Sequence, residues 1–375
     1  MEQRWKMDKP LKIIIAGGKT GGHLFPGIAI AQAFSAAVPG TRILFVGTGE
    51  TFETTTLDRY GFDHTAISIS GIKGKGLMGK LSTALRLPVS LVQTFTIIRG
   101  FKPDIVMGVG GYSSGPVVLV ARLLNILTAI QEQNTIPGIT NRILSRICHV
   151  VFTSFKSTRG LSKNAVIHHT GNPVRKSDIQ SSGSVQSDFG QGSGCFNLLV
   201  TGGSQGAHSI NQAMVGAMTL LKDPAAVFLV HQTGKADAAE VADAYHTLGV
   251  NGVARAFFDD LPQRMAGADL IVSRAGAGAI SEITHLGKPS ILVPYPHAAD
   301  DHQRFNAQAV KDQGGAVLIL DRDLTPERLK TIIEDLHNNP EHRLSMGRAA
   351  KGMALSDPAR AIVDICLSMA GKKGK

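Results

Sequence analysis

Two glycine-rich segments, each after a run of apolar residues, carry the clearest chemical signal in the sequence. One runs from Gly17 through Gly-Lys-Thr-Gly-Gly to His23, and the other from Gly202 through Gly-Ser-Gln-Gly to Ala207. Glycine lets the backbone turn tightly and approach a ligand closely. A helix that follows presents unpaired N–H groups and the positive end of its dipole. Each segment therefore predicts a phosphate or diphosphate site, and the pair predicts two similar halves.

The two segments do not fit the common nucleotide-binding motifs. Neither one is a GxGxxG fingerprint with an acid at the ribose-binding distance. A P-loop (GxxxxGK) would need glycine six residues before Lys19, where Ile13 stands. These departures disfavour an NAD enzyme and a P-loop NTPase. A turn that merely ends its strand tightly stays open as an alternative for each segment.

One residue of the first half is a candidate for acid–base chemistry, and two polar segments of this half are candidates for ligand contact. His23 stands at the start of a helix, where the dipole favours a neutral imidazole that can act as a general base. Tyr112 lies in a third glycine-rich segment, 108–116, and Glu132 lies in the polar run 131–134. The alternatives are a structural histidine, a turn before a helix at 116–125, and a satisfied polar network.

In the second half, the candidates would bind a nucleotide sugar. Glu282 follows a predicted strand and lies about one turn into a helix from about Ala277, where its carboxylate can accept both hydroxyls of a ribose. Gln303 and Asn306 share a helix face and could read sugar hydroxyls, unless they simply begin a surface helix. Asp321 and Asp323 resemble an Asp-x-Asp metal site. No third oxygen ligand is evident, so a solvated loop is favoured and no metal is expected.

Length and composition bound the class of protein. The 375 residues suit two domains, and the hydrophobic content of 43% fits a folded protein. The sequence has no apolar run long enough to span a bilayer, and its first ten residues lack the apolar stretch expected of a signal peptide. The three cysteines lack metal or disulfide spacing, which favours a reducing, cytoplasmic setting.

Apolar runs alternate with helical patterns along the whole chain. In the first half, continuous runs predict buried parallel strands, and helices fall between them. The predicted strands are 11–16, 42–47, 104–109, 126–130, 148–153 and 165–169, and the helices are 26–38, 51–60 and 78–100. A Ser/Gly/Gln-rich stretch, 177–194, reads as a linker or exposed loop. Strands are then predicted at 196–201, 226–231, 253–257, 269–273, 290–294 and 316–320.

This alternation predicts an α/β protein with two Rossmann-like, doubly wound parallel-sheet domains. The expected boundaries are 1–175 and 176–356. A terminal helix from about 357 to 375 has proline at its first position and one apolar face. The sequence does not decide onto which domain this helix packs.

Several short motifs, in order, resemble those of the MurG family, the bacterial peptidoglycan N-acetylglucosaminyltransferases. The matching segments are Gly17–Pro26, Gly110–Pro116, Glu132–Asn134, Gly171–Arg175, Gly202–Ala207, Phe258–Leu261, Ser281–Glu282 and His302 to Asn306. The resemblance implies a GT-B fold with a cleft between the domains. It also implies inverting transfer of N-acetylglucosamine (GlcNAc) from UDP-GlcNAc to the 4-hydroxyl of N-acetylmuramic acid (MurNAc) in undecaprenyl-diphosphoryl-MurNAc-pentapeptide.

The resemblance also assigns the site residues and needs no cofactor besides the donor substrate. The donor site would comprise Thr20, Gly21, Gly22, Asn134, Arg175, Ser204, Phe258, Ala277, Gly278, Ala279, Ile280, Ser281, Glu282 and Gln303. The acceptor diphosphate would meet Gly18, Lys19, Gly111 and Ser113. His23 is the favoured base, and Tyr112 and Glu132 are the other candidates. Two departures stand out: Lys19 is inserted in the first turn, and Gln131 stands where histidine is common.

The charge distribution adds an expected membrane partner. Net charge is +10, and between His64 and Gln131 the only acid is Asp104. A helical stripe with a basic rim predicts docking on the anionic cytoplasmic leaflet, unless the stripe is ordinary core. Its members are Leu77, Met78, Leu81, Leu85, Lys73, Lys75 and Lys80. The low aromatic content of 5% disfavours nucleic acid.

The resemblance implies a peripheral protein on the cytoplasmic face of the inner membrane, with other cell-wall synthesis proteins as partners. Two other functions stay open at this point. One is a different GT-B glycosyltransferase with a lipid acceptor, such as a diacylglycerol glucosyltransferase. The other is a non-catalytic nucleotide-sugar-binding protein, which would not need the acceptor-side turns.

Overall fold

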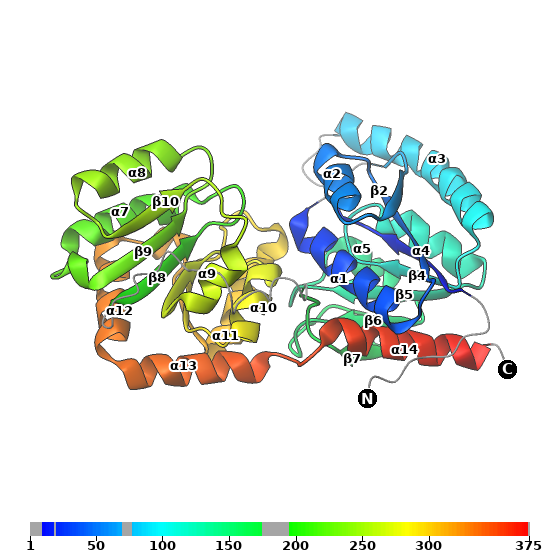
Figure 1. Cartoon of the computed structure of the whole chain (residues 1–375). Coiled ribbons are helices and arrows are strands. Elements are labelled where there is room, and N and C mark those ends of the chain that lie inside the picture. The colour runs from blue at the N-terminus through cyan, green and yellow to red at the C-terminus, as the bar shows by residue number, and fades with distance from the viewer. Residues whose placement is uncertain (1–9, 19, 70–76, 175–194, 374–375) are drawn as a thin grey trace. The chain divides into compact units, whose positions relative to one another are not determined.

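The computed structural model describes residues 10–18, 20–69, 77–174 and 195–373, and only the backbone of 77–86 and 372–373. The chain divides into two compact units, Met1–Arg175 with Ser356–Lys375, and Lys176–Leu355. Each unit is built on one parallel sheet (Figure 1). The predicted linker 177–194 lies outside the described residues.

The sheet of the first unit has the strand order β3-β2-β1-β4-β5-β6-β7. Its strands are β1 (Lys12–Ala16), β2 (Arg42–Gly47), β3 (Asp63–Ala66), β4 (Ile105–Gly108), β5 (Leu127–Glu132), β6 (Val150–Thr153) and β7 (Ile167–His169). Its helices are α1 (Gly21–Ala37), α2 (Thr51–Arg59), α3 (Leu77–Phe101), α4 (Ser114–Leu123), α5 (Ile139–Leu144) and α14 (Pro358–Lys373). The central strands β4 and β5 are buried along their whole length because helices cover both faces of the sheet.

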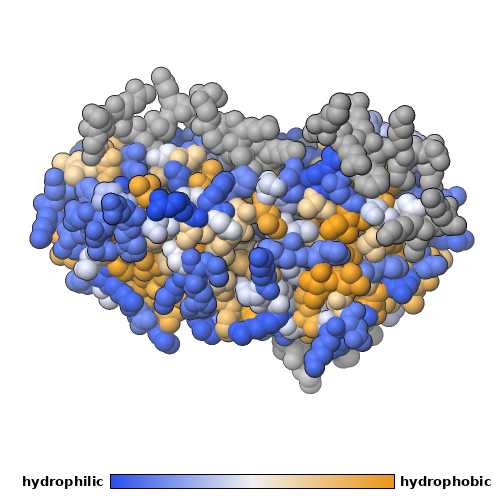
Figure 2. All heavy atoms as spheres, turned by 90° about the horizontal axis from the view of Figure 1, so that it is seen from below, coloured by the Kyte–Doolittle hydropathy of each residue, from blue (hydrophilic) through white to orange (hydrophobic). Residues whose placement is uncertain are grey.

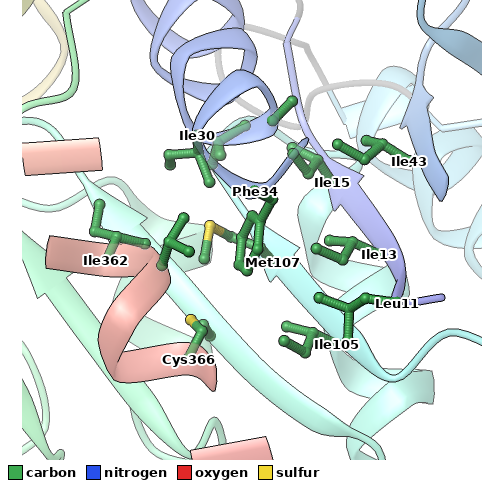
Figure 3. Packing of buried hydrophobic residues seen from close by; sticks show 14 of the residues in the cluster. Leu11, Ile13, Ile15, Ile30, Phe34, Ile43, Ile105, Met107, Ile362 and Cys366 are labelled. Carbon is green, nitrogen blue, oxygen red and sulfur yellow. The ribbon is translucent and has the colours of Figure 1, made fainter. Parts of the chain in front are cut away.

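The terminal helix α14 packs on the first unit, against α1. Figure 3 shows Ile362 and Cys366 of α14 directed into the core that Phe34 of α1 and Met107 of β4 share. Asp357 caps this helix, since its carboxylate accepts the Arg360 N–H at 3.0 Å. Packing thus settles a point that the apolar face of the helix could not, and on the other sheet face α3, α4 and α5 supply the cover.

The sheet of the second unit has the order β10-β9-β8-β11-β12-β13. Its strands are β8 (Phe196–Thr201), β9 (Val227–Gln232), β10 (Gly252–Arg255), β11 (Leu270–Ser273), β12 (Ser290–Leu292) and β13 (Ala316–Leu318). Its helices are α7 (His208–Leu220), α8 (Ala238–Thr247), α9 (Leu261–Gly267), α10 (Ala277–Leu286), α11 (His302–Asp312), α12 (Pro326–Asn338) and α13 (Pro340–Met353), with 3-10 turns η2 (Pro224–Ala226), η3 (Ala299–Asp301) and η4 (Asp321–Asp323). The first strand of each unit, β1 or β8, therefore occupies the same place in its sheet.

The predicted fold class is confirmed, with local differences. The sequence missed β3, a polar edge strand that lacks the apolar run of its neighbours. Helix α1 begins at Gly21 rather than 26, because the Thr20 carbonyl already accepts the N–H groups of His23 and Leu24. Pro26 lies inside this helix and is buried. Seen from below, hydrophobic residues lie in small groups between hydrophilic ones on the visible surface (Figure 2).

Candidate functional site

The glycine-rich segments follow the strands at which the order of each sheet reverses. In the first unit this point lies between β1 and β4, and in the second between β8 and β11. Ligands of doubly wound sheets bind beyond the carboxyl ends of the strands at such a point. The segments after all four strands, which start at Gly17, Val109, Gly202 and Arg274, therefore lie where the topology expects ligands.

In the first unit, the turn after β1 and the turn after β4 are in contact. Gly17 and Gly18 have φ of 123° and 134°, a backbone region that side chains rarely allow. A Cβ on Gly17 would lie 2.1 Å from the Gly110 carbonyl oxygen, so these two backbones can only meet as glycine. Gly111 lies next to Gly18, since a Cβ built on Gly111 would lie 4.0 Å from the Gly18 nitrogen. The structure thus brings together the glycines of the two turns predicted to hold the acceptor diphosphate.

The imidazole of His23 lies against the second of these turns. A Cβ on Gly110 would stand 2.5 Å from His23 Cδ2 and 2.9 Å from Nε2. Thr20 Oγ1 and His23 Nδ1 are 3.1 Å apart, within hydrogen-bond distance. When Nδ1–H donates to Thr20, Nε2 carries the lone pair that a general base needs. Thr20 and Gly110 therefore hold the ring in one position.

Glu132 is buried at the end of β5, and both of its carboxylate oxygens accept hydrogen bonds. Oε1 accepts the backbone N–H of Asn134 at 2.8 Å and its side-chain amide at 3.2 Å, while Oε2 accepts the Asn141 amide at 2.8 Å. Burial raises the pKa of Glu132, against the lowering effect of these bonds. The geometry gives Glu132 the means to hold Asn134 in place. Tyr112, the third candidate base, is half-buried in the turn before α4.

Gln131 belongs to a polar network, which was one of the two alternatives from sequence. Its side-chain amide donates to Ser154 Oγ and to Asn172 Oδ1, both at 3.1 Å, and the residue is fully buried. Gln133 is buried as well and donates to the Val109 carbonyl at 2.7 Å. The end of β5 is therefore tied to the segments that follow both of its neighbouring strands, β4 and β6.

In the second unit, the turn after β8 packs against the neighbouring backbone at Gly206 and is exposed to solvent at its tip. A Cβ on Gly206 would lie 1.9 Å from the Thr233 carbonyl oxygen, and one on Gly234 would lie 2.3 Å from the Gln205 carbonyl oxygen. Ser204 and Gln205 are exposed at the tip. The turn leads directly into α7, whose first N–H groups suit an anion.

Phe258 lies in the loop after β10, next to Gln232. Its N–H donates to Gln232 Oε1 at 3.0 Å, and its ring is buried beneath the Arg264 guanidinium, 4.2 Å from the ring centroid. Arg264 is in turn paired with Asp260 at 2.8 Å. The loop predicted to meet the uracil base is therefore rigid at its centre.

Helix α10 begins at Ala277, as predicted, and Ala277–Ile280 form its first turn. Ser281 Oγ donates back to the Ala277 carbonyl at 2.8 Å, and Glu282 is half-buried further along the helix. Gln303 Oε1 accepts the Tyr295 N–H at 2.9 Å, which fixes the loop before α11. Asn306 is fully buried against the Ala275 carbonyl, so the expectation that it reads a sugar hydroxyl is wrong.

Asp321 is part of an ion-pair network, not of a solvated loop as the sequence suggested. It pairs with Arg274, and Ser209 Oγ bonds both residues at 2.7 and 2.9 Å. Arg274 also donates to the carbonyls of Val293 and Pro294. No sequence pattern indicates this pairing, because Arg274 and Asp321 are far apart along the chain.

Some of the predicted site residues fall outside the residues whose side chains the structure describes. Lys19, Lys73, Lys75 and Arg175 lie outside the described residues, and the predicted membrane stripe Leu77, Met78, Lys80, Leu81 and Leu85 lies in α3 where only the backbone is described. Among the described residues, no helix has both the length and the apolar character to cross a membrane. The same residues contain no cluster of three or more His, Cys, Asp or Glu side chains suited to a metal ion.

Comparison with known proteins decides the family. The Glycosyltransferase family 28 N-terminal domain matches residues 13–153, and the corresponding C-terminal domain matches 197–362. A UDP-N-acetylglucosamine--N-acetylmuramyl-(pentapeptide) pyrophosphoryl-undecaprenol N-acetylglucosamine transferase of Anaeromyxobacter dehalogenans is 41% identical over 97% of this chain and 94% of that protein. The chain belongs to this family of N-acetylglucosamine transferases. A Myxococcus xanthus protein of the same name is 40% identical over 96% of this chain and 93% of its own length.

Solved structures agree with that assignment. The MurG of Acinetobacter baumannii is 28% identical, with a TM-score of 0.78 over 96% of this chain and 100% of that one. The calicheamicin glycosyltransferase CalG4 is 15% identical over 96% of this chain and 99% of its own, with a TM-score of 0.68, and supports the fold alone. The family resemblance drawn from the short motifs is therefore confirmed, and so are the GT-B fold and the glycosyltransferase class.

Proposed function

We propose that this enzyme transfers GlcNAc from UDP-GlcNAc to the 4-hydroxyl of MurNAc in undecaprenyl-diphosphoryl-MurNAc-pentapeptide. The product is the β1→4-linked disaccharide lipid that serves as a peptidoglycan precursor. The observation that carries the proposal is 41% identity over 97% of the chain to transferases named for these substrates. Inversion at the anomeric carbon follows because the donor is α-linked and the product β-linked, as in a single in-line displacement.

The second unit supplies most of the donor site in this proposal. The rigid loop at Phe258 meets the uracil, Glu282 accepts the ribose hydroxyls, and Gln303 reads the GlcNAc hydroxyls. Ser204 and the N-terminus of α7 face the diphosphate, whose negative charge increases as UDP leaves. Fixed N–H dipoles stabilise that charge without reorganising, so the proposal assigns no metal or other cofactor to this step. The first turn of α10, from Ala277 to Ser281, lines the same site.

The first unit contributes the remaining groups. Thr20, Gly21, Gly22, Asn134 and Arg175 complete the donor site, and Gly18, Lys19, Gly111 and Ser113 bind the acceptor diphosphate. His23 is the proposed base that removes the proton of the 4-hydroxyl. Its support is the contact with Gly110 and the Thr20 hydrogen bond, which fix the ring beside the glycine turns. Glu132 acts through Asn134, which its carboxylate orients.

We propose further that the enzyme is peripheral on the cytoplasmic face of the inner membrane. The described part of α3, with α4 and α5, carries apolar side chains that are open to solvent: Val89, Val92, Phe95, Leu119, Leu123, Ile139 and Ile143. Arg99, Arg122 and Arg146 are exposed on the same helices or just after them. Apolar side chains with arginines beside them suit an anionic bilayer, which also holds the lipid acceptor. Other cell-wall synthesis proteins at that membrane are proposed partners.

A direct assay tests the reaction. The protein is incubated with UDP-GlcNAc and a lipid-linked MurNAc-pentapeptide analogue, and UDP release is measured together with the disaccharide product by mass spectrometry. Release of UDP with a disaccharide on the analogue supports the proposal. Turnover only with a diacylglycerol acceptor would favour a different lipid glycosyltransferase, and donor binding without any turnover would favour a non-catalytic binder.

A further inference from the structure

Gln232 ends strand β9 at the carboxyl edge of the second sheet, between two loops of the proposed donor site. Strand β9 lies between β8 and β10, and Gln232 is in register with Thr201 on one side and Arg255 on the other. The turn 202–207, proposed to face the diphosphate and called the diphosphate turn below, starts directly after Thr201. The loop 256–260, proposed to meet the uracil base and called the base loop below, follows Arg255. The middle position of this row is therefore the one from which a single side chain can contact both.

The carboxamide of Gln232 makes that connection. Its Nε2 donates to the Gly203 carbonyl in the diphosphate turn at 3.1 Å, and to Thr201 Oγ1 at 3.4 Å. Its Oε1 accepts the Phe258 N–H in the base loop at 3.0 Å. The residue is 1% exposed, so water does not compete with these bonds.

The strand end that carries Gln232 is fixed from its other side by His231. Successive side chains of a strand point to opposite faces, so His231 faces away from Gln232. Its Nδ1 is 2.8 Å from the Tyr245 hydroxyl and its Nε2 is 3.0 Å from Asn211 Oδ1. The Asn211 amide donates to Asp237 at 2.7 Å and to the Thr233 carbonyl at 2.9 Å. The strand end from which Gln232 makes its hydrogen bonds is therefore itself held in place by buried hydrogen bonds.

We propose that Gln232 is a positioning residue that sets the separation between the diphosphate turn and the base loop. UDP would touch both segments at once, so a fixed separation lets the second contact form without further ordering. The inference rests on the donor site proposed above. It predicts that Gln232 matters for a ligand that spans the two segments and not for a ligand that occupies one of them.

The test measures the affinities of UDP, uridine and pyrophosphate for the wild type, Gln232→Met and Gln212→Met by ligand-observed NMR. Methionine keeps the length of the side chain and removes its hydrogen bonds to Gly203, Thr201 and Phe258. Gln212 is an exposed control in the same unit that bonds Glu240 at 2.8 Å. We expect Gln232→Met to weaken UDP by about ten-fold or more while uridine and pyrophosphate change by less than about two-fold. Gln212→Met should leave all three affinities unchanged.

Two results would overturn the inference: a UDP affinity within about two-fold of wild type, or an equal loss for all three ligands, which indicates that each segment is itself damaged rather than their separation changed. Glu282→Ala is measured in parallel. If it also leaves UDP binding unchanged, the donor site is misplaced and the inference falls with it. If it weakens UDP while Gln232→Met does not, the inference alone is rejected.

A second measurement needs no variant. In the wild type with selectively labelled phenylalanine, the Phe258 amide should exchange slowly with solvent before any ligand is added, because Gln232 Oε1 holds it. Slow exchange supports the hydrogen bond from the Phe258 N–H to Gln232 Oε1. Fast exchange of this amide in a folded sample would contradict it.

Discussion

Replacing Gly110 by alanine should disable the enzyme by moving His23. The new Cβ would lie 2.5 Å from His23 Cδ2 and 2.9 Å from Nε2. Carbon atoms in contact prefer about 3.5–4.0 Å, so the ring must move by about 1 Å to make room. The Thr20 bond to Nδ1, now 3.1 Å long, would be lost or distorted by a shift of that size.

The size of the effect follows from the displacement. A misplacement of about 1 Å in a reacting group costs about 100-fold in rate. Gly110 also has a φ of +100°, so alanine there carries backbone strain of about 1–3 kcal/mol. We expect kcat for disaccharide formation to fall about 100-fold, and the KM for UDP-GlcNAc to change by less than about three-fold, since most donor contacts are proposed in the other unit.

Gly40→Ala is the matched control. Gly40 has a φ of +80° in the same unit, and a Cβ there would have nothing within 4 Å. It therefore reproduces the strain of a positive φ without touching His23, and kcat should stay within about two-fold of wild type. If folded Gly110→Ala has the same kcat as Gly40→Ala, the position of His23 does not matter and its assignment as the base is refuted.

Three further results are expected. Burial lowers the pKa of His231 to about 3, so the unfolded chain takes up a proton that the folded one refuses as pH falls below about 6.5. The free energy of unfolding should drop by about 2 kcal/mol between pH 7.5 and 5 from this group alone. Denaturant unfolding at several pH values checks this, and an equal drop in His231→Gln and in the wild type would contradict it. Glu282→Ala should raise the KM for UDP-GlcNAc about ten-fold or more, and unchanged kinetics would remove this carboxylate from the site. Leu123→Asp, at a side chain 76% exposed, should weaken cosedimentation with anionic vesicles, whereas Leu220→Asp on the other unit should not; equal effects would argue against the proposed membrane face.

The sequence was sufficient for the fold because the deciding signals are local. Continuous apolar runs ending in glycine gave the parallel strands and the turns after β1, β4 and β8, and proline after Asp357 gave the start of α14. Strand β3 is not predicted from the sequence because its residues are mostly polar and it is a strand only through its pairing with β2. The unit onto which α14 packs is not predicted either, because an apolar helix face does not specify which hydrophobic core it packs against.

Within the candidate site, the sequence indicates residues on turns as candidates and does not indicate the residues that support those turns. Gln232 ends an apolar strand and Arg274 directly follows one, which is a signal in the sequence. Their roles nevertheless depend on partners tens of residues away, Phe258 and Asp321. Glu132 is a candidate base under the family resemblance. Only the three-dimensional contacts reveal that its oxygens are engaged with Asn134 and Asn141.

The proposed transfer is tested most directly by product analysis with the purified protein. UDP-GlcNAc and a lipid-linked MurNAc-pentapeptide analogue are incubated with wild type and His23→Ala, and both UDP and the glycosylated lipid are quantified. We predict equimolar UDP and a β1→4-linked GlcNAc-MurNAc lipid with wild type, and a rate at least about 100-fold lower with His23→Ala. A wild type that binds UDP-GlcNAc but forms no disaccharide on this acceptor would contradict the assigned function.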